Sequence, residues 1–306
     1  MAWTETLKGW ALKRGCSVTW GSLENLRRVR RELSARRTSG ELDESLYEAE
    51  LRPMVEASDW PGARAVVLVA RSSRASRLSF ETKDGCAEAL LPPTYTHYRA
   101  SFEELRQDLE THGLPGARVE HLVAPLKALA AALGIVKYGR NNIAYTEEFG
   151  SYMQLYGYLT DAALEEEGPR AVRPQMLPQC ESCGACLAAC PTGAIGEDRL
   201  LLRAERCLTY ANENPGPWPD WVPRGAHNAL LGCLACQRAC PANPELPVDE
   251  VGVRFTRGET AALLAEGSPG EKRSETGFRT KLAWLGRPDA EDILARNLRA
   301  LLDRAL

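Results

Sequence analysis

"CESCGACLAACPTGAI", Cys180–Ile195, places four cysteines two, two and three residues apart and follows the last of them with a proline. Downstream, "CLACQRACP" (233–241) holds three more cysteines with two and three residues between them, and it also ends in a Cys-Pro step. A single cysteine, Cys207, lies between these runs in "RCLTY". Eight of the ten cysteines in the chain therefore fall between residues 180 and 240, which makes this segment the strongest signal in the sequence.

The spacing of these cysteines favours iron–sulfur clusters. Thiolate is a soft ligand that suits both iron–sulfur clusters and zinc. Zinc sites favour two close pairs of ligands, whereas Cys-x2-Cys-x2-Cys-x3-Cys-Pro is the run of two-cluster ferredoxins, whose fourth cysteine binds the other cluster. Four, one and three cysteines make eight ligands, enough for two 4Fe–4S clusters. A pair of structural zinc sites is the alternative.

The ferredoxin rule divides the eight cysteines into two crossed sets. The first set, expected to hold one cluster, is Cys180, Cys183, Cys186 and Cys240. The second set, expected to hold the other, is Cys190, Cys207, Cys233 and Cys236.

Composition narrows the class of protein. The 306 residues carry a net charge of −3 at a pI of about 6.0, so no broad basic excess indicates nucleic-acid binding. The first residues show no apolar core of a signal peptide, and no apolar run approaches the roughly 20 residues that span a bilayer. We therefore expect a cytoplasmic protein, where clustered cysteines indicate metal rather than disulfides. Cys16 and Cys86, outside the cluster, are expected to be ordinary buried thiols.

Periodicity predicts a mixed α/β domain up to about residue 165. Residues 1–36 are typical of two helices separated by "GCSVTWGS". The apolar runs 63–71 and 117–123 predict buried strands, and 141–161 predicts strands joined by a turn at "EEFG". Two further helices are expected, one capped by Ser101 with Glu104 and running to about residue 112, the other lying between Pro125 and Gly134. These elements suggest a core of three layers.

The chain therefore divides into three predicted parts. Residues 1–170 form an α/β (α+β) domain, residues 171–250 a ferredoxin-like segment with two 4Fe–4S clusters, and residues 251–306 a short helical tail. The polar stretch "EEEGPRAVRPQ" (165–175) marks the first boundary.

This order of parts resembles the epoxyqueuosine reductase family, enzymes that use cobalamin and two 4Fe–4S clusters to make queuosine in tRNA. The likeness is carried by "CGACLAACPTGAI", "RCLTY" and "GCLACQRACP", and upstream by "GIVKYGRNNIAYTEEFGSYMQLYGYLTD" (134–161). The resemblance implies a cobalamin-binding first domain, with cobalamin held non-covalently between that domain and the cluster segment. It implies that the residues against the corrinoid are Gly139, Arg140, Asn141, Gly150 and Ser151.

The chain departs from the family where a proton donor is expected. The family carries an Arg-Asp-Tyr-His signature whose Asp is the proposed donor, and the corresponding region here, "LPPTYTHYRASFEEL" (91–105), has no acid before its helix. The candidates that remain are His97 and Tyr95, with Tyr98 as a further phenol. Because histidine titrates near neutral pH and a phenol near pH 10, His97 is the better matched general acid.

These features predict a cobalamin-dependent iron–sulfur reductase, an oxidoreductase supplied with electrons by a ferredoxin or flavodoxin. Epoxyqueuosine in tRNA is the substrate that the resemblance implies, although the missing acid and the short tail count against tRNA. Two alternatives stay open. One is a cobalamin reductase of a different small molecule, as in reductive dehalogenases. The other is an electron-transfer iron–sulfur protein with no substrate of its own.

Overall fold

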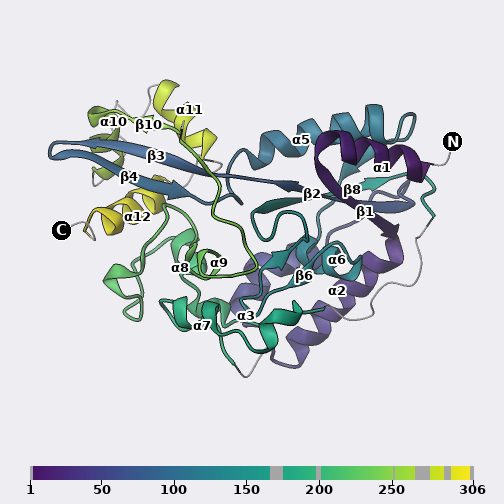
Figure 1. Cartoon of the computed structure of the whole chain (residues 1–306), viewed down its shortest axis with the longest axis horizontal. Helices are drawn as coiled ribbons and strands as arrows, with labels where there is room; N and C mark the ends of the chain where they lie inside the picture. The colour runs from purple at the N-terminus through teal and green to yellow at the C-terminus, as the bar shows by residue number, and fades with distance from the viewer. Residues whose placement is uncertain are drawn as a thin grey trace. The chain divides into compact units, whose positions relative to one another are not determined.

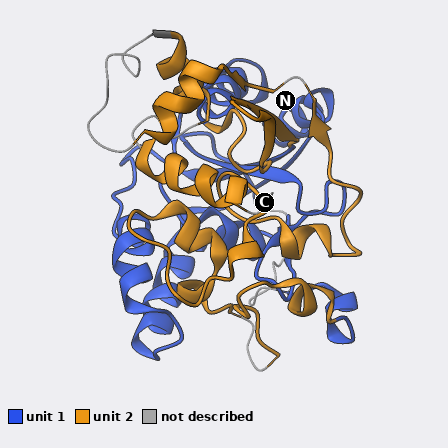
Figure 2. Ribbon diagram, turned by 90° about the vertical axis from the view of Figure 1, so that its left-hand side faces the viewer, with its two compact units in different colours: residues 1–72, 99–183 blue, residues 73–98, 184–306 orange. Residues whose placement is uncertain are grey.

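The computed structural model (Figure 1) describes residues 3–165, 175–197, 201–250, 252–265, 276–285 and 291–303. The chain folds into two compact units, coloured separately in Figure 2. Unit 1 comprises residues 1–72 and 99–183, and unit 2 comprises residues 73–98 and 184–306. The division into functional parts at residues 170 and 250 does not follow these units and stays a prediction. Most of the predicted linker, residues 166–174, lies outside the described residues.

Unit 1 is built on a four-stranded antiparallel sheet in the order β1-β2-β8-β5. Its strands are β1 (Cys16–Ser22), β2 (Ala65–Ser72), β8 (Met153–Thr160) and β5 (Val119–His121). The Val-rich run of β2 is buried at six consecutive positions, as expected for a strand with neighbours on both sides and a layer on each face. The predicted strands at 63–71 and 117–123 are confirmed, as is the strand pattern within 141–161.

Helices cover both faces of this sheet (Figure 1), which confirms the expected three layers. On one face, α2 (Leu23–Thr38) and α6 (Leu126–Ala132) pack against the side chains of Val66, Leu68 and Ala70. On the other face lie α1 (Trp3–Arg14) and α5 (Tyr98–Asp108), the latter continued by a π-helical turn, Leu109–Gly113. Short helical segments, α3 (Glu44–Leu46), a π-helical turn (Tyr47–Leu51) and α4 (Arg52–Val55), follow α2.

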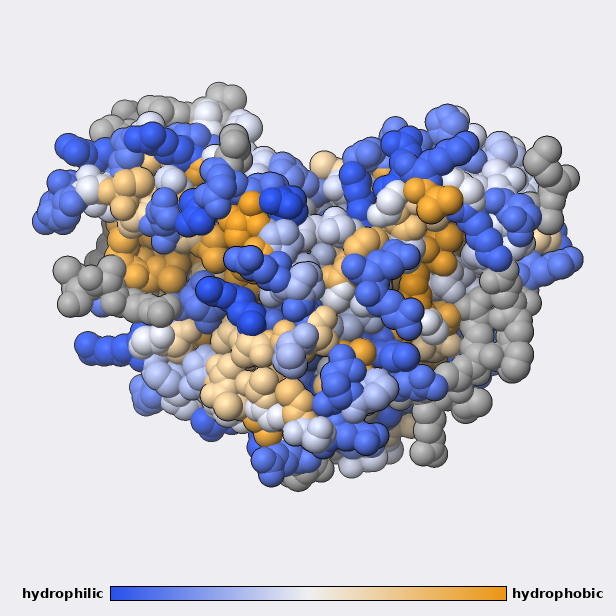
Figure 3. Space-filling model, in the orientation of Figure 1, coloured by the Kyte–Doolittle hydropathy of each residue, from blue (hydrophilic) through white to orange (hydrophobic). Residues whose placement is uncertain are grey.

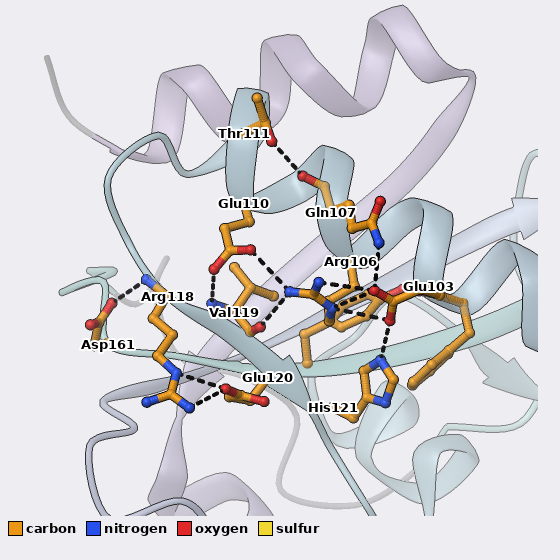
Figure 4. Close-up of polar contacts among 12 residues, drawn as sticks. Glu103, Arg106, Gln107, Glu110, Thr111, Arg118, Val119, Glu120, His121 and Asp161 are labelled. Carbon is orange, nitrogen blue, oxygen red and sulfur yellow. Dashed lines mark hydrogen bonds and ion pairs between the residues drawn. The ribbon is translucent and has the colours of Figure 1, made fainter.

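An ion-pair network joins α5 to the edge strand β5 (Figure 4). The Arg106 guanidinium donates to the carboxylates of Glu103 and Glu110 and to the carbonyl of Val119 at 3.1 Å. His121 lies on β5 with its Nε2 3.1 Å from Glu103 Oε2. These contacts fix the helix that follows the candidate residues Tyr95 and His97.

Unit 2 contains a hairpin of β3 (Ala75–Thr82) and β4 (Gly85–Leu91). Two short strands, β9 (Val248–Asp249) and β10 (Arg254–Phe255), pair in parallel with β3. The apolar face of the hairpin packs against the three helices predicted for the tail, α10 (Arg257–Leu264), α11 (Thr276–Trp284) and α12 (Glu291–Asp303). Phe80 stacks on Phe255 with ring centroids 4.8 Å apart, so the tail completes the core of unit 2.

Three predictions about local structure are wrong. The segment "GCSVTWGS" is not a simple break, because residues 16–22 pair along their whole length with β2. Ser101 does not cap a helix, since α5 has already begun at Tyr98, after His97 in a left-handed conformation with φ 54°. Cys86 is exposed, because it lies beside the turn of the β3–β4 hairpin, whereas Cys16 is buried as expected.

Within the described ranges, no helix has the length and apolarity needed to cross a membrane. On the face drawn in Figure 3, hydrophilic residues surround smaller apolar areas. Among the described large hydrophobic side chains, Leu12 and Val123 are the exposed ones.

Candidate redox site

Short helical turns carry most of the cysteines. A 3-10 turn, Pro178–Glu181, contains Cys180, and α7 (Ala185–Ala189) contains Cys186 and ends at Cys190. Cys207 precedes α8 (Leu208–Glu213), and α9 (Ala235–Arg238) contains Cys236. Helix α7 packs against α9 in unit 2.

The second set of cysteines comes together within unit 2. Burial, followed by the negative charges of Cys233, Cys207, Cys190 and Cys186, the last of which belongs to the first set, raises the pKa of Cys236. Burial and the charge of Cys233 likewise raise the pKa of Cys207. Each effect requires proximity, so sulfurs from three separate segments share one neighbourhood, and Cys207 is among them. That these four cysteines bind iron stays a prediction.

Hydrogen-bond donors surround these sulfurs. Burial raises the pKa of Cys190, but backbone N–H groups of Thr192, Ala194 and Ile195, with the Thr192 side chain, outweigh burial and hold its pKa below the usual value. Backbone N–H groups of Thr209 and Tyr210 donate to Cys207. Donors of this kind stabilise thiolate and help to set the potential of an iron–sulfur cluster. The donors outweigh burial at Cys190, whereas burial still raises the pKa of Cys207, Cys233 and Cys236.

A side-chain amide also contacts this set. Asn228 Nδ2 lies 3.2 Å from Cys233 Sγ and donates to Ala226 O at 2.9 Å, while Asn228 Oδ1 accepts from Leu234 N at 2.7 Å. One side chain thus fixes the chain on both sides of Cys233. The sequence contains no pattern that identifies Asn228 beforehand, because its role depends on the loop conformation.

The first set divides between the two units, with Cys180 and Cys183 in unit 1 and Cys186 and Cys240 in unit 2. Its assignment to one cluster stays a prediction. Among the described His, Cys, Asp and Glu side chains, no three converge as ligands of a single metal ion. Cysteines that bind different iron atoms of one cluster do not have to converge on a single ion.

The residues that the resemblance places against a corrinoid form two tight turns in unit 1. Gly139 lies between β6 (Lys137–Tyr138) and β7 (Ala144–Tyr145), where an added Cβ would come within 2.4 Å of Asn141 Oδ1 and 2.7 Å of Tyr145. Asn141 is buried, donates to Tyr145 Oη at 2.9 Å and accepts from Ile143 N at 3.2 Å. A side chain at residue 139 would therefore have to displace the Asn141 and Tyr145 side chains.

Arg140, Gly150 and Ser151, the remaining residues of this group, also have structural roles within unit 1. Arg140 donates to the carbonyl of Cys180 from two nitrogens, at 2.8 and 3.3 Å, and so ties this turn to the first cysteine run. Gly150 has φ 57° and its carbonyl accepts from Thr146 N at 3.0 Å, with Ser151 buried beside it. The side-chain amide of Asn141 is engaged internally, so a ligand here would be met mainly by backbone groups of the turns.

The proton-donor candidates differ in their surroundings. His97 is exposed, and its ring centroid lies 4.7 Å from that of Trp284 in an edge-on arrangement. Burial raises the pKa of Tyr98 to about 12, which makes it a poor acid near neutral pH. Tyr95 Oη donates a short hydrogen bond to the carboxylate of Glu213, and it lies so close to Gly232 that a Cβ there would be 2.6 Å away. The structure thus brings an acid to Tyr95 that sequence reasoning missed.

Comparison with known proteins agrees with this arrangement. Residues 179–243 match the model of a 4Fe-4S double cluster binding domain, which confirms a double-cluster segment. The chain is 35% identical over 117 residues to epoxyqueuosine reductase of Bacillus subtilis (strain 168), covering 38% of this chain and 28% of the relative. It is 33% identical over 193 residues to epoxyqueuosine reductase of Gloeobacter violaceus (strain ATCC 29082 / PCC 7421), covering 60% of this chain and 57% of the relative. The predicted resemblance is confirmed, although the matched part spans less than two thirds of these relatives.

Solved structures show the same likeness in fold. Epoxyqueuosine reductase from Streptococcus thermophilus superposes with a TM-score of 0.64 at 19% identity, over 99% of this chain and 81% of the other. A crystal structure of epoxyqueuosine reductase with a tRNA-Tyr epoxyqueuosine-modified stem loop gives 0.64 at 23% identity, over 98% and 81%. The mixed α/β fold with a double-cluster region is therefore that of epoxyqueuosine reductases.

Proposed function

We propose that the chain is an iron–sulfur oxidoreductase that passes electrons singly through two 4Fe–4S clusters to cobalamin and from there to a bound substrate. The observation that carries this proposal is the meeting of Cys190, Cys207, Cys233 and Cys236 among backbone N–H donors within the matched double-cluster segment. A ferredoxin or flavodoxin is the electron donor that fits such a relay.

Residues 139–141 and 150–151 are the proposed corrinoid contacts. Gly150 has a positive φ, a backbone conformation that glycine adopts readily, whereas at Gly139 the protein's own Asn141 and Tyr145 side chains fill the space of a Cβ. Arg140 holds the carbonyl of Cys180, so this segment is mechanically linked to the first cluster's ligands. When bound, cobalamin supplies low-valent cobalt as the reductant.

Proton delivery is assigned to Tyr95 together with Glu213, with His97 as the rival. Tyr95 Oη donates to the Glu213 carboxylate, and Glu213 closes the helix that Cys207 begins. Delivery from this pair requires a protonated Glu213, which donates to Tyr95 Oη as that hydroxyl releases its own proton to the substrate; an ionised Glu213 instead accepts the Tyr95 proton and holds it away from the substrate. His97 is exposed, and its described contact is an edge-on one with the Trp284 ring rather than with an acid.

Epoxyqueuosine in tRNA is the proposed substrate, because the relatives with the same fold bear that name and one was solved with a modified tRNA stem loop. The absence of an acid in the segment 91–98 favours a second candidate, reduction of a different small molecule through the same cofactors.

The test is anaerobic reconstitution of the full chain with iron, sulfide and cobalamin, followed by a visible spectrum and metal analysis. We expect about eight iron atoms per chain, from two four-iron clusters, and bound cobalt. If the protein binds both clusters but no corrinoid, its function is electron transfer without a substrate of its own. The assay that separates the two candidate substrates is reduction of an epoxyqueuosine-modified RNA stem loop. If tRNA is the substrate, the protein should reduce this stem loop, and the rate should fall as salt is added.

A further inference from the structure

We propose that α12 belongs to the binding site of the second cluster. In this account Arg296 and Asn297 are positioning residues that hold the segments bearing Cys207 and Cys233, and the charge of Arg296 favours the reduced state of that cluster. The inference rests on the proposed function only in requiring that the second set of cysteines holds a 4Fe–4S cluster.

Asn297 joins the two cysteine-bearing segments directly. It is fully buried, and its Nδ2 donates to Asn212 O at 2.9 Å, to Asn212 Oδ1 at 3.0 Å and to Leu230 O at 2.9 Å. Asn212 lies in α8, which starts immediately after Cys207, and Leu230 lies three residues before Cys233. A single amide from the tail therefore fixes the spacing between the segments that carry these two ligands.

Arg296 extends this clamp along the same loop. Its Nη1 donates to Gly216 O at 2.6 Å, and its Nη2 donates to Ala211 O at 2.9 Å and Asn212 O at 3.2 Å. Asn297 Oδ1 accepts from the same guanidinium at 3.1 and 3.2 Å, so the two neighbours brace each other. The guanidinium also lies 4.0 Å from the Trp218 ring centroid.

The charge of Arg296 is not neutralised locally. Its hydrogen bonds go to three carbonyl oxygens and one amide oxygen, and among the described residues no carboxylate pairs with it. Burial lowers the pKa of Arg296, which nonetheless stays protonated because the ordinary value is far above neutrality.

The Arg296 guanidinium can stabilise the negative charge of the proposed second cluster. Reduction adds one electron to a 4Fe–4S cluster already held by four thiolates, so a neighbouring cation stabilises the reduced form. With a rise of about 1.5 Å per residue, Asn212 lies roughly 7 Å along α8 from Cys207. A unit charge about 10 Å away at an effective dielectric of about 20 changes a one-electron equilibrium by roughly tenfold. That factor corresponds to about 59 mV for one electron.

The test compares Arg296→Gln and Arg296→Lys with Arg299→Gln. Arg299 lies on the same helix but donates to Leu264 O, away from α8, and so serves as the matched control. Each full-length protein is reconstituted anaerobically, its folding is checked by circular dichroism, and its iron content is measured. A redox titration with dithionite, followed by electron paramagnetic resonance, gives the potentials of the two one-electron steps.

For Arg296→Gln we expect one of the two steps to fall by about 59 mV, or half of the iron to be lost, while Arg299→Gln behaves as wild type. Arg296→Lys keeps the positive charge, so the reduction potential of the second cluster should stay at its wild-type value. It loses the planar set of guanidinium donors, so iron should leave to a chelator faster than from the wild type. The inference would be overturned if Arg296→Gln had the same iron content and the same two reduction potentials as the wild type. If that variant does not fold, a wild-type rate of iron loss in Arg296→Lys overturns it instead. Wild-type protein that binds fewer than two clusters would refute the proposed function itself.

Discussion

Asn228 shows how much one side chain contributes at the cluster segment. Its amide donates towards Cys233 Sγ and to Ala226 O, and its oxygen accepts from Leu234 N. Outer hydrogen-bond partners of this kind orient ligands and tune a metal centre. Asn228 therefore belongs to the site even though it binds no iron.

Replacing Asn228 with Leu removes all three hydrogen bonds at nearly constant volume. We expect iron to leave the reconstituted protein about 10–100-fold more readily, measured as the rate of release to a chelator. Asn214→Ala is the control, because Asn214 donates only to Tyr210 O in the same segment. Equal release rates for both variants would contradict the role assigned to Asn228.

The proton donor can be identified by three substitutions. If Tyr95 and Glu213 act together, Tyr95→Phe and Glu213→Gln should each lower turnover by roughly 10²–10⁴-fold, with iron content unchanged, and His97→Ala should have little effect. The measurement is single-turnover reduction by the fully reconstituted enzyme. A large loss in His97→Ala alone would restore histidine as the acid.

At the scale of elements, Gly157 sets how closely α6 approaches the sheet. A Cβ at this position of β8 would lie 2.4 Å from Leu126 Cδ2 and 3.3 Å from Leu68 Cδ2. Gly157→Ala should therefore lower the free energy of unfolding by about 1–3 kcal/mol through overpacking. Gly9→Ala in α1, where a Cβ meets nothing within 4 Å, should instead raise it by up to about 1 kcal/mol. Urea denaturation of both variants checks this, and equal effects would contradict it.

The contact between α5 and β5 should depend on pH (Figure 4). Hydrogen bonds from Arg106 and then Gln107 hold the pKa of Glu103 at about 2. Glu103 therefore contributes stability above its unfolded pKa of about 4.3, and this contribution is lost as the pH falls towards 2. Glu103→Gln should be less stable than wild type at pH 7.

The difference between the two proteins should shrink below about pH 4.3, the unfolded pKa of glutamate. Thermal unfolding of both across this range provides the measurement. Glu120→Gln is the control, since Glu120 pairs with exposed Arg118, and an isolated surface pair contributes little. Glu103 instead contacts Arg106, Gln107 and His121 together. A difference that widens on acidification would refute the assignment.

The sequence predicted those helices and strands that are determined by residues close to one another along the chain. The Val-rich run of β2, the helix between Pro125 and Gly134 and the tail helices are all of this kind, and the structure contains them. The hairpin β3–β4 was missed although Asp84-Gly85 marks its turn, and β1 was missed because its pairing with β2 is a long-range property. The same limit applies to the site: cysteine spacing identifies ligands, whereas Glu213, Asn228 and Arg296 act through contacts that spacing does not encode.

For the whole molecule, the sequence order of the parts differs from their packing. Residues 73–98, which include Tyr95 and His97, belong to the same unit as Cys207, Cys233 and the tail. The tail residues Arg296 and Asn297 also contact the segment after Cys207. The proposed proton donor and the proposed clamp on the second cluster are therefore parts of one folded unit rather than of separate domains.

The central claim is that two 4Fe–4S clusters are held by crossed sets of cysteines, with Cys207 completing the second. Iron and sulfide analysis of anaerobically reconstituted wild type, Cys207→Ser and Cys86→Ser tests it most directly. Cys86 is exposed and remote in sequence from both runs, so its variant is the control. We predict about eight iron atoms in wild type and Cys86→Ser, and about four in Cys207→Ser. Full iron content in Cys207→Ser would contradict the account.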